Sequence, residues 1–199
     1  MKDMKKSPSR GIKSCDEDEL TGRAEPAATL LNACQNGDRE AQRQIYELYK
    51  KPMYQLTFRL VGPQEAADLT QQIFLQLFQK IDQFAGRSRF RTWLYRLAVN
   101  ECLQHLRRQK RTVPGRLVAD PVDSSVSEID RLEQHELLEH VLSRLEPDLR
   151  TIFLLKEVEH LSYAELVETL EIPEGTVASR LNRARTQLKA SLIELGWEP

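Results

Sequence analysis

The stretch from Ile172 to Leu192 combines cations with short polar side chains at helical spacing. Four Lys or Arg residues stand there against one acid, Glu174. In a helix, one face would be apolar, made of Val177, Leu181, Ala184, Leu188 and Leu195. The opposite face would present Thr176, Ser179, Asn182, Arg183 and Thr186, with Arg180 and Arg185 flanking the apolar stripe. Such a face suits the major groove of DNA, because short polar side chains reach base edges while arginines neutralise phosphates. A solvated helix whose cations only balance acidic neighbours is the alternative.

A second basic stretch covers residues 86–111. It holds 8 Lys or Arg residues and a single acid, Glu101, with Phe90, Trp93 and Tyr95 interleaved. Cations beside aromatic side chains are what single-stranded DNA binding requires. The alternative is that Phe90, Trp93 and Leu97 are ordinary core residues, and for Trp93 core packing is favoured over a base contact.

No pattern for catalysis or metal binding is evident. His135 and His140 are five residues apart, which places them about 140° apart around a helix and argues against a shared metal. The sequence has no glycine-rich phosphate loop and no spacing typical of a nucleophile–His set. Its three cysteines, Cys15, Cys34 and Cys102, are widely separated. We therefore expect no enzyme activity, no cofactor and no metal.

Composition predicts helices. The 199 residues are 40% hydrophobic and 30% charged, with only 8 Gly and 9 Pro. No apolar run reaches the roughly 18 residues of a membrane span, and the N-terminus lacks the apolar core of a signal peptide. These features predict an all-α, cytoplasmic protein.

The charges are segregated along the chain, although the net charge is only -1. Residues 27–112 hold 14 basic and 7 acidic side chains, whereas residues 113–170 hold 5 and 13. Charge asymmetry of this kind points to separate surfaces for an anionic partner and for another protein.

Apolar periodicity predicts two small helical domains. Residues 1–26 are nearly devoid of apolar side chains and read as a disordered tail. Helices are expected between 27 and 112, with breaks at Asn36-Gly37-Asp38, Gly62-Pro63 and Phe84–Ser88. Residues 113–131 are acidic and aperiodic, and predict a flexible linker. Helices resume over 132–199.

The last two helices predict a helix-turn-helix. Ser162 and Glu165 have the spacing of a capping box, which marks the start of a helix ending near Leu170. A tight turn at Glu171-Ile172 follows, and Pro173 suits the first position of the basic helix.

The segment from Leu161 to Arg185, LSYAELVETLEIPEGTVASRLNRAR, resembles the region 4 helix-turn-helix of the sigma-70 family, most closely that of the extracytoplasmic function (ECF) group. Residues 66–111, AADLTQQIFLQLFQKIDQFAGRSRFRTWLYRLAVNECLQHLRRQKR, resemble sigma region 2. The resemblance implies a subunit that gives RNA polymerase its promoter specificity and melts the −10 element.

The resemblance also implies three surfaces. Core RNA polymerase would be bound by Asp68, Gln71, Gln72, Phe74 and Leu75. The −10 element would be held by Gly86, Arg87, Ser88, Phe90, Arg91, Trp93, Asn100, Arg107, Arg108 and Lys110, with a flipped base in the loop from Phe84 to Phe90. The −35 element would be read by Thr176, Ser179, Arg180, Asn182, Arg183 and Arg185. An anti-sigma factor is a further partner implied by the family.

The chain departs from the family pattern at four positions. Gln72 replaces an acid on the polymerase surface, and Ala178 stands where relatives carry Lys or Arg. Val167 replaces alanine where the two helices meet. Glu171 replaces a turn glycine, so a left-handed conformation there would cost about 1 kcal/mol or more.

Two other non-catalytic functions remain open. An ordinary helix-turn-helix regulator would explain the C-terminal part but not residues 66–111. A sigma mimic that only sequesters an anti-sigma factor should lack the DNA-facing arginines, yet Arg91, Arg107, Arg180, Arg183 and Arg185 are all present.

Overall fold

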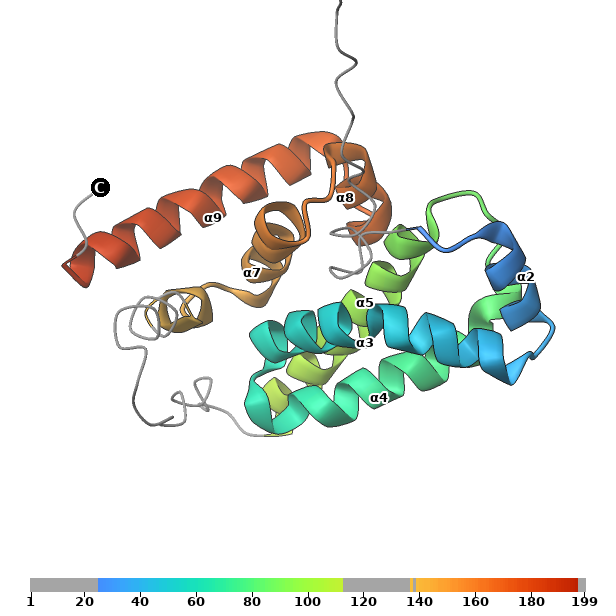
Figure 1. Ribbon diagram of the computed structural model, residues 1–199. Coiled ribbons are helices and arrows are strands. Elements are labelled where there is room, and N and C mark those ends of the chain that lie inside the picture. The colour runs from blue at the N-terminus through green and yellow to red at the C-terminus, as the bar shows by residue number, and fades with distance from the viewer. Residues whose placement is uncertain (1–24, 113–136, 138, 197–199) are drawn as a thin grey trace, which may run out of the picture.

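A computed structural model describes residues 25–112, 137 and 139–196 of the chain (Figure 1). Within these ranges the regular structure is helical and contains no strand, as the composition predicts. No helix among the described residues has the length and apolarity needed to cross a membrane. The predicted linker, residues 113–131, and the predicted tail up to residue 24 lie outside the described residues.

The N-terminal unit consists of α2 (Ala28–Gln35), α3 (Arg39–Val61), α4 (Pro63–Lys80), the short 3₁₀ helix η1 (Ile81–Gln83) and α5 (Phe90–Thr112). The predicted breaks at Asn36–Asp38 and Gly62-Pro63 are confirmed. The Asp38 carboxylate caps α3 by accepting a hydrogen bond from the backbone N–H of Ala41 at 2.9 Å. Gly62, with φ of 92°, ends α3 in a conformation that favours glycine, and Pro63 opens α4.

The loop between η1 and α5 is tied to the body of the unit at both ends. The Gln35 side-chain amide donates to the carbonyl oxygens of Ile81 at 3.0 Å and Phe84 at 2.9 Å. The backbone N–H of Phe90, the first residue of α5, donates to the carboxylate of Glu25. Glu25 therefore satisfies one of the free N–H groups at a helix start from a distant part of the chain.

The C-terminal unit contains helical residues 139–143, α7 (Pro147–Phe153), the π-helical segment η2 (Leu154–Val158), α8 (Tyr163–Leu170) and α9 (Glu174–Glu194). The capping box at the start of α8 is present as predicted: Ser162 and Glu165 each bond the other's backbone N–H. Pro173 was predicted at the first helical position, but α9 begins one residue later and Pro173 precedes it.

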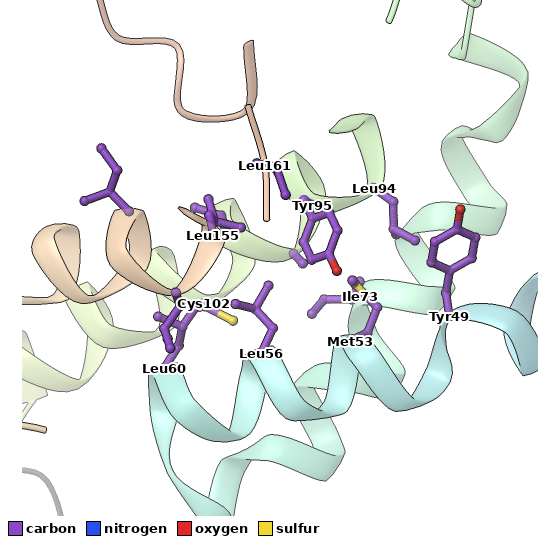
Figure 2. Close-up of a cluster of buried hydrophobic side chains, with 14 of the residues drawn as sticks. Tyr49, Met53, Leu56, Leu60, Ile73, Leu94, Tyr95, Cys102, Leu155 and Leu161 are labelled. Carbon is purple, nitrogen blue, oxygen red and sulfur yellow. The ribbon is translucent and has the colours of Figure 1, made fainter. Parts of the chain in front are cut away.

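The two units pack against each other. In Figure 1, α7 lies between α9 and the bundle formed by α3, α4 and α5, while α8 contacts α5. Leu155 and Leu161 of the C-terminal unit are fully buried in one apolar cluster with α3 and α5 (Figure 2). Cys34 and Cys102 are also buried in this core.

A buried arginine joins the ends of two helices, one in each unit. Arg150 is 3% exposed, and its guanidinium donates to the carbonyl oxygens of Leu60 at 3.2 Å and Ser143 at 2.6 Å. It also donates to the carbonyl oxygen of Leu145 at 3.2 Å. Burial lowers the pKa of Arg150, although nearby Glu139 acts in the opposite direction. A guanidinium is never neutral in proteins near pH 7, so this charge stays in the core and is solvated by carbonyl groups.

We expect Arg150→Ala to lower the free energy of unfolding by about 2–4 kcal/mol, because it leaves buried carbonyl groups without partners and opens a cavity. Urea unfolding followed by circular dichroism measures the change. Arg144→Ala is the matched control, since Arg144 is exposed and pairs with Glu194 only at 3.4 Å; it should change stability by less than about 0.5 kcal/mol. Equal stability of the two variants would contradict this account of Arg150.

Candidate nucleic-acid interface

The turn between α8 and α9 has a left-handed residue. Glu171 adopts φ of 53° and ψ of 40°, a left-handed conformation that is sterically unfavourable for a residue other than glycine.

Val177, Leu181, Ala184 and Leu188 of α9 are buried, as the apolar stripe predicts. Leu195 was predicted on the same face but is 40% exposed, because α9 ends at Glu194 and the chain turns there.

The polar face of α9 points away from the core. Ser179, Asn182, Arg183 and Thr186 are exposed, while Thr176 and Arg180 are half-buried. The Ser179 and Thr186 hydroxyls donate to carbonyl oxygens one turn earlier in α9, at 3.1 and 2.9 Å. Arg183 forms no ion pair with any other described residue. Its guanidinium is therefore available to an outside ligand.

The two flanking arginines are held by acidic residues of the C-terminal unit. Arg180 lies 3.7 Å from the Asp148 carboxylate, and Arg185 lies 2.5 Å from that of Glu157. Hydrogen bonding to Glu157 raises the pKa of Arg185. These pairs fix the two guanidinium groups at the edges of the polar face, where they remain partly exposed.

Most of the predicted −10 residues lie on the surface. Gly86, Arg87, Asn100, Arg107, Arg108 and Lys110 are exposed, and Ser88 is half-buried. Arg107, Arg108 and Lys110 lie towards the C-terminal end of α5, where cations also complement the helix dipole.

Phe90 of the predicted −10 set is fully buried. Its ring packs on Phe84 with centroids 5.4 Å apart and on Trp93 with centroids 5.9 Å apart. Trp93 is half-buried, and its ring also packs on Phe84 in a tilted arrangement, with ring centroids 5.4 Å apart. The ring of Phe90 supports the loop from within, and the packing of Trp93 agrees with the core interpretation that the sequence favours.

Arg91, also of the predicted −10 set, is covered by α8. Its side chain is 9% exposed, and its guanidinium lies 3.8 Å from the Glu165 carboxylate. Burial alone would raise the pKa of Glu165, but hydrogen bonds from Ser162 and the charges of Arg91 and Arg89 outweigh it, so the pKa is lowered. The carboxylate is therefore ionised at neutral pH.

The predicted polymerase surface on α4 is largely accessible. Asp68, Gln71 and Gln72 are exposed and Leu75 is 62% exposed, which is unusual for a leucine in a helical bundle. Phe74 of the same predicted set is 3% exposed and packs under Tyr46, with ring centroids 4.8 Å apart.

Two exposed aromatic residues of α3 lie outside the surfaces predicted from the sequence. Tyr46 and Tyr54 are 39% and 42% exposed, and Lys50 lies over the Tyr46 ring at 5.9 Å. The signal was present, because positions 46, 50 and 54 repeat every four residues on one side of the helix. This stripe adjoins Phe74 and extends the surface of α4.

Comparison with known proteins identifies the family. The sigma-70 region 2 model matches residues 45–112, and the sigma-70 region 4 model matches residues 135–188. The chain is 34% identical to the ECF RNA polymerase sigma factor SigW of Bacillus subtilis over 183 residues, covering 83% of this chain and 96% of that protein. The chain belongs to the ECF sigma factors. It is also 33% identical to the ECF RNA polymerase sigma-E factor of Escherichia coli K12, covering 78% of this chain and 88% of the relative.

Solved sigma factors share the fold. The structure of CnrH in complex with the cytosolic domain of CnrY matches with a TM-score of 0.64 at 21% identity, covering 83% of this chain and 96% of that one. Bartonella quintana RpoE, crystallised with the anti-sigma factor NepR, matches with a TM-score of 0.62 at 22% identity, covering 75% and 95%.

The left-handed conformation at position 171 predicts a preference for glycine in this ECF sigma factor. Glu171→Gly should have a free energy of unfolding about 0.5–1 kcal/mol higher than that of Glu171→Gln, because both variants lose the ion pair with Arg96 and only glycine adopts this conformation without steric cost. Glu168→Gly, in the middle of α8, should instead be about 1 kcal/mol less stable than Glu168→Gln. Thermal or urea unfolding measures both differences, and a Glu171→Gly variant less stable than Glu171→Gln would rule out strain at this turn.

Proposed function

We propose that this chain binds core RNA polymerase and directs it to promoters, where it recognises the −35 element as duplex and the −10 element as it melts. The chain supplies promoter specificity and catalyses no reaction itself. Family membership supports this function, together with two cationic surfaces on two helical units. The protein would act in the bacterial cytoplasm, at the nucleoid when joined to polymerase.

The polar face of α9 carries the proposal. It is exposed, it lies opposite the buried seam of the helix, and Arg183 has no ion pair within the described residues. A helix whose cations only balanced acidic neighbours would pair them all, as Arg180 and Arg185 are paired. Arg183 is thus in place for a base edge or phosphate.

The N-terminal unit is proposed to bind the −10 element and polymerase. Exposed Arg87, Arg107 and Lys110 provide cations for the DNA backbone. The loop from Phe84 to Phe90 is rigidly anchored, so it can hold an unstacked base without large reorganisation. On α4, exposed Leu75 with Asp68, Gln71 and Gln72 forms a mixed apolar and polar surface suited to protein docking.

An anti-sigma factor is proposed as the regulatory partner. NepR is described as an anti-sigma factor in its complex with a sigma factor of the same fold. An ordinary helix-turn-helix regulator leaves the exposed α4 surface unexplained. A mimic that only sequesters an anti-sigma factor has no use for the exposed face of α9.

Transcription with purified components tests the proposal. Core polymerase with this chain should initiate at a defined set of sites on genomic DNA, which start-site mapping would reveal. Core polymerase alone is the control. If both reactions give the same start sites, the proposed function is rejected.

Arg183→Ala should reduce transcription from a promoter that contains the −35 element recognised by this chain. We expect a reduction of about ten-fold, because this factor corresponds to the loss of one good base or phosphate contact. Binding to core polymerase, measured by fluorescence anisotropy, should not change. Lys189→Ala is the control, because Lys189 is an exposed cation of the same helix that lies one turn beyond Thr186, the last residue of the polar face. A loss of polymerase binding by Arg183→Ala would contradict the division of surfaces between DNA and protein.

A further inference from the structure

Two side chains from the first part of the chain hold the ends of the loop that is proposed to capture the −10 base. At the start of the loop, the Gln35 side-chain amide donates to the carbonyl oxygens of Ile81 and Phe84. At its end, the Glu25 carboxylate accepts a hydrogen bond from the backbone N–H of Phe90. In Figure 1, α2, which ends at Gln35, lies beside this loop. We call Glu25 and Gln35 the loop anchors.

Aromatic rings below the loop fix its two end residues as well. Phe84 and Phe90 meet edge to face with centroids 5.4 Å apart, and the buried Tyr49 packs on Phe90 with centroids 5.6 Å apart. These rings hold the side chains. The loop anchors bind backbone groups, so they also fix the directions in which the backbone leaves the core at each end of the loop. Pro26, which follows Glu25, is buried and holds that end of the anchor in place.

The middle of the loop is less constrained than its ends. Ala85, Gly86 and Arg87 are exposed and Ser88 is half-buried. Residues 85–88 form no backbone hydrogen bond with another described residue. A loop with fixed ends loses less conformational freedom when it closes on an unstacked base than a loop that is free throughout. The anchors therefore lower the cost of capturing the base.

We propose that Glu25 and Gln35 are positioning residues for capture of the −10 base, acting through the backbone of the loop. This inference rests on the proposed function. It gives a role to two residues outside every surface predicted from the sequence, and Glu25 belongs to the segment that was predicted to be a tail. Both precede residues 45–112, which the sigma-70 region 2 model matches.

The two anchors have opposite chemical requirements, which makes them separable by nearly isosteric exchanges. The N–H of Phe90 needs an acceptor, so Glu25→Gln, whose amide oxygen still accepts, should keep the anchor. The carbonyl oxygens of Ile81 and Phe84 need donors, so Gln35→Glu should lose it, because a carboxylate has no hydrogen to donate. Glu25→Ala removes the acceptor altogether.

Two neighbouring residues provide matched controls. Asp82 and Gln83 are exposed residues of η1, directly before the loop. Asp82→Ala removes the same charge as Glu25→Ala, and Gln83→Glu adds the same charge as Gln35→Glu. Any effect of net charge on DNA binding is therefore equal within each pair.

Hydrogen exchange of the Phe90 amide, followed by NMR in the free chain, tests the anchor itself. Glu25→Ala should speed this exchange about five-fold, as expected for loss of one hydrogen bond, whereas Glu25→Gln should stay within about two-fold of the unmodified chain. Asp82→Ala should leave the rate unchanged. Equal rates in Glu25→Ala and Asp82→Ala overturn the proposal.

Base capture is measured with the chain joined to core polymerase. The probes are labelled single-stranded oligonucleotides that cover the −10 element of a promoter found by start-site mapping, either complete or with one abasic position. The ratio of the two affinities, at the position where it is largest, reports the contribution of the captured base. This ratio should fall about five-fold in Glu25→Ala and in Gln35→Glu, and it should be unchanged in both controls and nearly unchanged in Glu25→Gln.

The ratio separates positioning from general damage to the fold. A merely structural role would weaken binding of complete and abasic oligonucleotides by the same factor and leave the ratio unchanged, which overturns the proposal. If the unmodified complex shows no abasic position that weakens binding, the proposed −10 function itself is rejected. If the unmodified complex shows such a position and Glu25→Ala leaves the ratio intact, only the role of the loop anchors is rejected.

Discussion

The arrangement of the two helical units depends on one buried charge. Arg150 cannot lose its proton in the core, so it must be surrounded by acceptors, and the available acceptors are the free carbonyl groups at the ends of two helices. One helix end belongs to each unit, so satisfying the guanidinium brings α7 against α3. Arg59 and Glu139, 3.0 Å apart, bridge the same junction. The apolar cluster in Figure 2 then closes around Leu155 and Leu161.

Local signals in the sequence were sufficient for most of the helices and their ends, although α9 begins one residue after Pro173 and ends before Leu195. Three kinds of signal set the helix ends: glycines at positive φ, the Asp38 cap and the Ser162–Glu165 capping box. Each involves only residues that are close together in the sequence, so its effect can be predicted without knowledge of the fold. The apolar period likewise predicted the buried face of α9 from Val177 to Leu188. The polar face of α9 is the opposite side of the same helix, which is why most of the predicted −35 residues are exposed.

The remaining site residues depend on contacts between distant segments. Phe90 and Phe74 have residue types suited to a ligand surface, and only the positions of Phe84 and Tyr46 show that they are packed inside. Arg91 was counted with the exposed cations because nothing near it in sequence indicates that Glu165 will cover it. Arg150 is the clearest case: an arginine in an amphipathic helix is normally exposed, and its burial follows from a helix end ninety residues earlier.

The two buried cysteines bear on how the protein can sense its surroundings. Burial raises the pKa of Cys34 and raises that of Cys102 to about 12, so both thiols stay protonated at physiological pH. Because peroxides and disulfides react with the thiolate, the folded core is chemically inert to oxidants at these two positions. A response of this chain to oxidative stress through Cys34 or Cys102 would therefore first require the core to unfold.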